Sequence, residues 1–191
     1  MRTIILFACL YLLVLSSSAQ QTVSCLIKTS LGDIRVELYP EKAPLTVANF
    51  LKYVDQNLYD GTNFYRVCTA ENEKDRKVKI QVIQGGDVSE AKQFAPVVME
   101  NTEQTKVRHL DGTLSMARDT PNSATSSFFI CVGDQPELDF AGKRNPDGQG
   151  FAAFGRVTEG MQIVKTIQAG EEKGQYLVSP LTIESIRRLN K

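Results

Sequence analysis

Few residues in this chain could perform acid–base, nucleophilic or metal chemistry. There is one histidine, His109, so a site built from several histidines is excluded. The four cysteines form no CxxC pair, which argues against a zinc or redox centre. A Ser-His-Asp triad would have to use His109, but no GxSxG segment supports one, and a lone loop histidine is more often structural or solvated. We therefore predict a function without metal or cofactor.

The glycine-rich segments do not match the common ligand loops either. Gly85-Gly86 and Gly148-x-Gly150 are not followed by the Lys-Ser/Thr of a phosphate loop. Residues 139–150 lack the alternating carboxylates and final Glu of an EF-hand. The chain has 22 basic and 22 acidic residues and no basic stripe, so no nucleic-acid partner is predicted.

Four ordered segments remain as distinctive features. They are Phe64-Tyr65-Arg66, the QGGD of residues 84–87, the GTLSMARDTPNSATSSFFICV of residues 112–132 and the FAAFGRV of residues 151–157. At these segments the sequence resembles the cyclophilin family, from about Leu26 to the C-terminus. It most resembles the bacterial branch, which shares the LDFAGKRNPDGQGFAAFGRV type of segment.

The resemblance implies peptidyl-prolyl cis-trans isomerase activity toward proline-containing polypeptides. Arg66 matches the catalytic arginine of the family, Gln84 a conserved-motif glutamine, and Phe129 the wall of the proline pocket. Further pocket positions are Val82, where the family usually has Met, Ala117 and Leu138. An Xaa-Pro amide rotates over a barrier of about 18–20 kcal/mol without breaking a bond, so neither nucleophile nor metal is required. A cationic donor aimed at the prolyl nitrogen would stabilise the twisted amide more than the planar one.

Other positions depart from the best-known members. Gln81 stands where many have Phe, Ser127 where many have Gln, Glu137 where many have Trp, and Phe151 where many have His. The absent Trp is a usual cyclosporin contact in the family. We therefore expect weak cyclosporin binding and an altered sequence preference.

The elements that would position these residues are mostly short strands. Ile34, Val36 and Leu38 alternate with charged residues, as in a half-buried strand. Pro44 opens a helix with an apolar face, and residues 161–167 form a second. Further strands are predicted at 23–29, 64–68, 78–84, 112–117, 128–132, 151–157 and 181–188. This pattern favours a β-barrel or sandwich, and the resemblance implies a closed eight-stranded antiparallel barrel capped by two α-helices. If Phe129 faces the pocket, Phe128 and Ile130 must face the core.

The N-terminus is typical of a secretory signal peptide. Arg2 precedes the unbroken apolar run of residues 4–15, and small residues 16–19 follow. We predict a signal at 1–19, cleaved after Ala19, and one isomerase domain at 20–191. The protein is then secreted or periplasmic, without stable membrane insertion after cleavage, and we expect a monomer. Two of the three remaining cysteines could form a disulfide, and the sequence does not choose the pair.

Two other functions stay open from the sequence. One is a proline-binding chaperone or interaction module with little turnover, which the altered pocket rim leaves open. The other is an extracellular effector that binds a partner through the charged loop at 70–77, although such a loop is usually only solvated.

Overall fold

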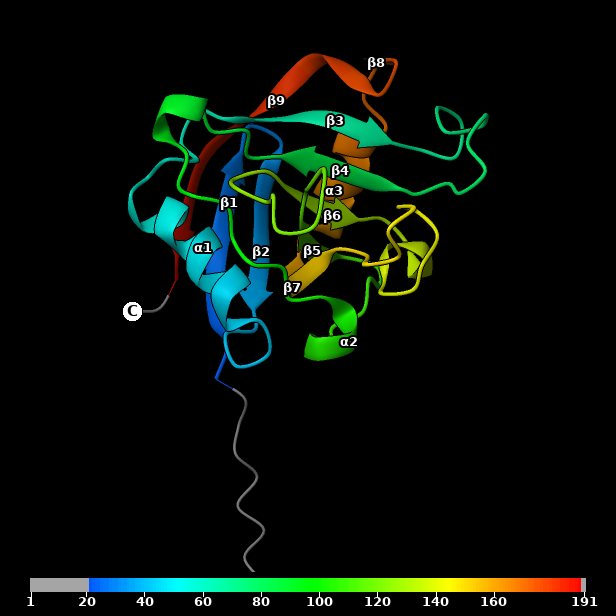
Figure 1. Cartoon of the computed structure of the whole chain (residues 1–191). Helices are drawn as coiled ribbons and strands as arrows, with labels where there is room; N and C mark the ends of the chain where they lie inside the picture. The colour runs from blue at the N-terminus through cyan, green and yellow to red at the C-terminus, as the bar shows by residue number, and fades with distance from the viewer. Residues whose placement is uncertain (1–20, 190–191) are drawn as a thin grey trace, which may run out of the picture.

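The computed structural model describes residues 21–189, so the predicted signal at 1–19 lies outside the described part of the chain. Eight antiparallel strands form a closed barrel in the order β1-β2-β7-β5-β6-β4-β3-β9, and the pairing of β1 with β9 closes it (Figure 1). The strands are β1 Val23–Thr29, β2 Gly32–Leu38, β3 Asn63–Cys68, β4 Val82–Gly85, β5 Thr113–Met116, β6 Phe128–Cys131, β7 Ala152–Glu159 and β9 Tyr176–Arg188. A two-residue strand, β8 (Glu172–Lys173), forms a hairpin with β9 alone. The predicted barrel is confirmed.

The barrel interior is filled by the inward side of each strand and by one helix. Helix α1 (Pro44–Asp55) inserts Phe50, whose ring lies 5.2–5.4 Å from those of Tyr59, Phe128 and Phe154. Such edge and tilted aromatic contacts stabilise a core beyond their burial alone. The predicted helix at 161–167 is α3 (Met161–Gln168), which packs against β2, β3 and β4.

Helix α1 begins at a proline and is capped from a distant loop. Ala43 precedes it and supplies no side-chain cap. Instead, the Glu100 carboxylate accepts hydrogen bonds from the backbone N–H groups of Leu45 (3.2 Å) and Thr46 (2.8 Å). A carboxylate at this end satisfies otherwise unpaired N–H groups and complements the helix dipole.

Four elements differ from the prediction. Strand β9 begins at Tyr176 although the strand was predicted from Leu181, and the short strand β8 was not predicted. A third α-helix, α2 (Thr102–Thr105), begins with a capping box in which Asn101 and Gln104 bond each other's backbone N–H groups. This helix was not predicted because a single turn is too short to show apolar periodicity. The strand predicted from Val78 begins only at Val82. The reason is that side chains occupy the preceding backbone groups: Glu73 accepts from the Ile80 N–H, Gln135 accepts from the Gln81 N–H, and Arg144 donates to the Val78 carbonyl.

Two long loops project from the same side of the barrel (Figure 1). One joins β3 to β4 across residues 69–81, and the other precedes β7 across residues 139–151. They are held together by an ion pair between Glu73 and Arg144. Among residues 21–189, no helix has the length and apolar character needed to cross a membrane.

Candidate active site

Three of the predicted site residues form one row across adjacent strands. Arg66 of β3 lies opposite Gln84 of β4, and Gln84 lies opposite Phe129 of β6. Directly opposed residues project from the same face of a sheet. Phe128 and Ile130 belong to the barrel core, whereas Phe129 belongs to a separate apolar cluster on the other face. The predicted alternation is therefore confirmed, and Arg66 and Phe129 lie on the same side of the barrel wall.

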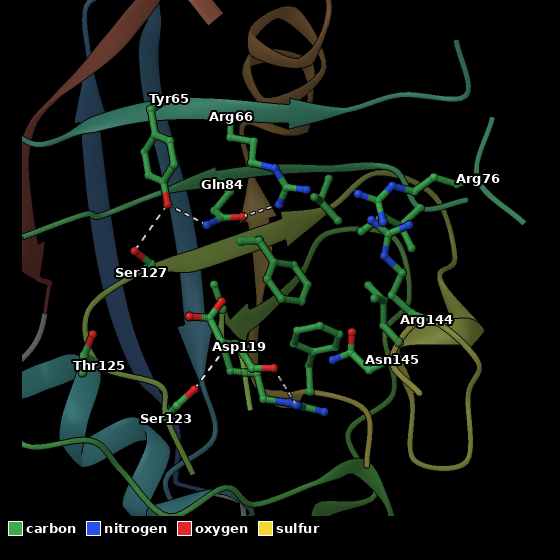
Figure 2. Close-up of a pocket in the computed structure, with 17 residues that line it drawn as sticks. Tyr65, Arg66, Arg76, Gln84, Asp119, Ser123, Thr125, Ser127, Arg144 and Asn145 are labelled. Carbon is green, nitrogen blue, oxygen red and sulfur yellow. Dashed lines mark hydrogen bonds between the residues drawn. The ribbon is translucent and has the colours of Figure 1, made fainter. Parts of the chain in front are cut away.

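The row forms part of an open cavity of about 430 Å³ (Figure 2). All six predicted site residues line it: Arg66, Val82, Gln84, Ala117, Phe129 and Leu138. Phe151 packs edge-on against Phe129, with 5.4 Å between ring centroids. In the sequence this residue was noted only because many cyclophilins have His there. The result is a small apolar surface around Phe129 in a cavity whose other lining residues are mostly polar, with the Arg66 guanidinium among them.

Arg66 is held by two amide oxygens. Its Nη1 donates to Gln84 Oε1 at 2.8 Å, while Nε and Nη2 donate to Gln175 Oε1 at 3.1 and 2.7 Å. A guanidinium has five N–H donors in a fixed fork, so two remain after these three bonds within the described residues. The arginine is thus a permanent cation with a fixed orientation and two donors to spare.

Tyr65 is a site residue that sequence reasoning did not assign. Its hydroxyl accepts a hydrogen bond from Gln84 Nε2 at 2.6 Å and lies 3.4 Å from Ser127 Oγ (Figure 2). Strict alternation would place Tyr65 and Arg66 on opposite faces. A register irregularity between Phe64 and Arg66 lets both reach the cavity, and bulges of this kind are not visible in a hydrophobic pattern.

We expected the charged loop at 70–77 to be only solvated, but one of its side chains is buried. The Glu73 side chain is fully buried and pairs with Arg144, whose side chain is only 8% exposed. Burial by itself would raise the pKa of the Glu73 carboxyl, but hydrogen bonds from Arg144 and the Ile80 N–H hold that pKa below its ordinary value. The loop therefore carries a buried carboxylate next to the cavity.

His109 proves to be structural. Its Nδ1 lies 2.7 Å from Asp139 Oδ1 and its Nε2 lies 2.9 Å from Ser115 Oγ, the contacts of a catalytic triad. Ser115 and His109 are, however, 0% and 1% exposed, and neither lines the cavity. The imidazole instead lies parallel to the Phe129 ring, with centroids 6.0 Å apart. The group supports the pocket wall and is not placed to attack a substrate.

The far end of the cavity has an unsatisfied donor. Asn145 lines the cavity, and its Nδ2 is buried without a hydrogen-bond partner among the described residues (Figure 2). Buried amide groups are normally paired, because an unpaired one costs about 1–3 kcal/mol. Asn145 can therefore donate to an acceptor that a ligand brings.

Cys25, Cys68 and Cys131 are buried and free in the structure. Burial raises the pKa of the Cys68 thiol to about 11, so it is protonated and unreactive at neutral pH. Within residues 21–189, no three His, Cys, Asp or Glu side chains are grouped so that they could hold a metal ion.

The cyclophilin resemblance implied a closed antiparallel barrel with an arginine beside an apolar proline pocket, and the structure has both the barrel and a clamped Arg66 beside Phe129. The family model of the cyclophilin type peptidyl-prolyl cis-trans isomerase/CLD family matches residues 24–188 of this chain. The chain belongs to this family, and it is a peptidyl-prolyl cis-trans isomerase.

Its similar curated proteins include bacterial isomerases. The chain is 39% identical to a peptidyl-prolyl cis-trans isomerase of Streptomyces antibioticus, over 85% of this chain and 96% of the relative. It is 37% identical to peptidyl-prolyl cis-trans isomerase A of Dickeya dadantii, over 91% and 88% respectively. The predicted similarity to bacterial members of the family is confirmed.

Solved structures agree on the fold. A cyclophilin-type isomerase of Cryptosporidium parvum superposes with a TM-score of 0.70 at 22% identity, covering 90% of this chain and 99% of that one. A second crystal structure of that protein, in the presence of the dipeptide Ala-Pro, gives a TM-score of 0.69 at 22% identity, covering 88% and 99%.

Proposed function

We propose that Arg66 catalyses Xaa-Pro isomerisation by donating to the prolyl nitrogen of a peptide held in the 430 Å³ cavity. The observation that carries the proposal is the clamped guanidinium of Arg66, which keeps two N–H donors beside an apolar surface. As the amide twists, resonance is lost and the nitrogen recovers its lone pair. A fixed donor then binds the twisted state more strongly than the planar one, which is the requirement for catalysis.

In this proposal the apolar residues hold the proline ring while the rest of the peptide turns. Phe129 is 4% exposed and can contact the ring, whereas Val82 (1%) and Leu138 (0%) pack in the same cluster and keep that surface in place. Ala117 leaves room at the rim, and Gln84 keeps Arg66 oriented through the 2.8 Å bond. The proline is held by apolar contact, and the charge acts only on the reacting nitrogen.

A protease-coupled assay on an Ala-Pro-Phe peptide tests the role of Arg66. Removing a single preorganised donor typically costs about 10²–10³ in rate, and we expect that loss in kcat/KM for Arg66→Ala. The matched control is Arg35→Ala, which removes an exposed strand arginine paired with Glu159, and it should retain wild-type activity. Full activity in Arg66→Ala would eliminate this mechanism. An inactive wild type that still binds proline peptides would favour the chaperone or interaction module.

We also propose that the clients are exported polypeptides and that the mature protein is a secreted or periplasmic monomer. The support for export is the signal-like segment at residues 1–19, with its single arginine and its apolar run. Expression of the full chain, followed by mass analysis of the exported fraction, should yield a species that begins at Gln20. Retention of residues 1–19 on a cytosolic product would contradict export.

A further inference from the structure

The support of Arg66 does not end at Gln175. On its other side, the Gln175 amide donates from Nε2 to Glu73 Oε1 at 2.8 Å. Glu73 is a buried carboxylate from a different loop, 102 residues away in sequence. A continuous chain of hydrogen bonds therefore runs from Glu73 through Gln175 to the guanidinium.

Glu73 decides which way the Gln175 amide faces. An ionised carboxylate only accepts hydrogen bonds, so the NH₂ end of the amide must point toward Glu73 and the oxygen toward Arg66. The pKa of the Glu73 carboxyl is held below its ordinary value, so it is ionised at neutral pH. With this acceptor in place, a reversed amide would direct its NH₂ at the N–H groups of Arg66.

Glu73 is itself held in place. Arg144 Nη2 donates to Oε1 at 2.8 Å, the Ile80 N–H donates to Oε2 at 3.0 Å, and Arg76 Nε lies 3.3 Å from Oε1. In Figure 2, Arg76 and Arg144 lie together on the side of the cavity toward which the Arg66 guanidinium points. The Glu73 carboxylate is therefore held in one position between the two projecting loops.

The Gln175 backbone is equally constrained. Its φ of +78° is in the left-handed region, at the turn between β8 and β9. Its N–H donates to Glu172 Oε2 at 2.7 Å, and its carbonyl accepts from the Val67 N–H at 2.8 Å. Because the backbone is fixed, the remaining freedom of the side chain is rotation and reversal of its amide, which Glu73 restricts.

We propose that Glu73 is a positioning residue for the isomerase, acting through Gln175 to hold the Arg66 guanidinium in its catalytic orientation. The inference rests on the proposed role of Arg66. It assigns to the β3–β4 loop a task in catalysis besides its contact with the second loop. A positioning residue of this kind should affect kcat more than KM, because Arg66 acts on the twisted amide while the apolar surface holds the ground state.

The test is a double-mutant cycle on the full-length enzyme with Glu73→Gln and Gln175→Gly. Glycine adopts a φ of +78° freely, so the second variant removes the amide without straining the turn. Misplacement of a catalytic group by about 1 Å can cost up to 10²-fold, and we expect kcat to fall about 10- to 100-fold in each single variant, with KM changed less than threefold. Glu71→Gln, an exposed acid in the same loop, is the matched control and should match wild type.

Non-additivity decides the outcome. If Glu73 acts through Gln175, Glu73→Gln should lower kcat less than threefold further in the Gln175→Gly background. Two independent losses that multiply, or a wild-type kcat in Gln175→Gly, would overturn the proposal. The latter measurement stands by itself if Glu73→Gln fails to fold, because Gln175→Gly leaves the Glu73–Arg144 pair in place. Parallel Arg66→Ala data separate the two proposals: if that variant is inactive while the Gln175 variant is normal, only the positioning role fails.

Discussion

Exchanging Arg66 for lysine separates the charge of this residue from its shape. The guanidinium makes three N–H bonds to two amide oxygens, at 2.7–3.1 Å, and retains two donors. Lysine keeps the positive charge, but it concentrates three protons on one nitrogen and has no planar fork. An ammonium that binds Gln84 Oε1 or Gln175 Oε1 therefore loses the bridge between them and with it a defined direction toward the substrate.

We expect kcat/KM of Arg66→Lys to lie about 10- to 100-fold below wild type, between wild type and Arg66→Ala. That loss corresponds to about 1.4–2.7 kcal/mol of transition-state stabilisation, roughly the net value of one hydrogen bond to a charged group. The protease-coupled peptide assay measures it, and thermal unfolding checks that the variant is folded. A kcat/KM for Arg66→Lys within threefold of wild type would show that the planar guanidinium is not required. Activity as low as that of the alanine variant would show that charge alone contributes nothing.

Three further predictions follow from other parts of the structure. Burial lowers the pKa of His109 despite the opposing effect of Asp139, so the unfolded chain binds this proton first as pH falls. The unfolding free energy should then decline below about pH 6.5, by at most about 1.4 kcal/mol per pH unit, until the folded-state pKa is passed. Urea titrations at pH 7.5 and 5.5 should show this decline in wild type and a smaller one in His109→Gln; equal declines would contradict it. Glu100→Ala removes the cap of α1 and should cost about 1 kcal/mol in the same titration, whereas an unchanged midpoint would mean that water replaces the cap. Cyclosporin should bind weakly because Glu137 replaces the usual Trp, and calorimetry giving a nanomolar Kd would refute this.

The sequence predicted the site residues that lie in the four segments resembling the cyclophilin family, and local periodicity predicted which way neighbouring strand residues face. The resemblance assigned the Phe129 ring to the cavity, and alternation then placed Phe128 and Ile130 in the core, because a strand has a side-chain period of two. Cross-strand register then brings Phe129 beside Gln84 and Gln84 beside Arg66. Barrel closure leaves little freedom in the strand register, so a correct prediction of the fold class also places these three residues side by side.

What the sequence did not reveal depends on contacts between distant segments. Glu73 lies in a run of charged residues that resembles any solvated loop, and its burial requires a partner from the loop that contains Arg144. Gln175 is one polar residue in a hairpin, and only the fold brings it to Arg66. Tyr65 reaches the cavity through a bulge, which breaks the very periodicity used for prediction. Pairings of this kind leave no mark on local composition.

The row of residues continues past the cavity to a group that resembles a triad. Ser115 lies opposite Phe129 in the strand register, and its hydroxyl lies 2.9 Å from His109 Nε2, while the imidazole is parallel to the Phe129 ring. Phe129 thus lies between a buried polar group on one side and Gln84 on the other. An isomerase breaks no bond, so it gains nothing from a nucleophile but needs a pocket wall that does not yield as the peptide twists. A Ser-His-Asp arrangement whose serine and histidine are buried provides that rigidity, since each member fixes the orientation of the next.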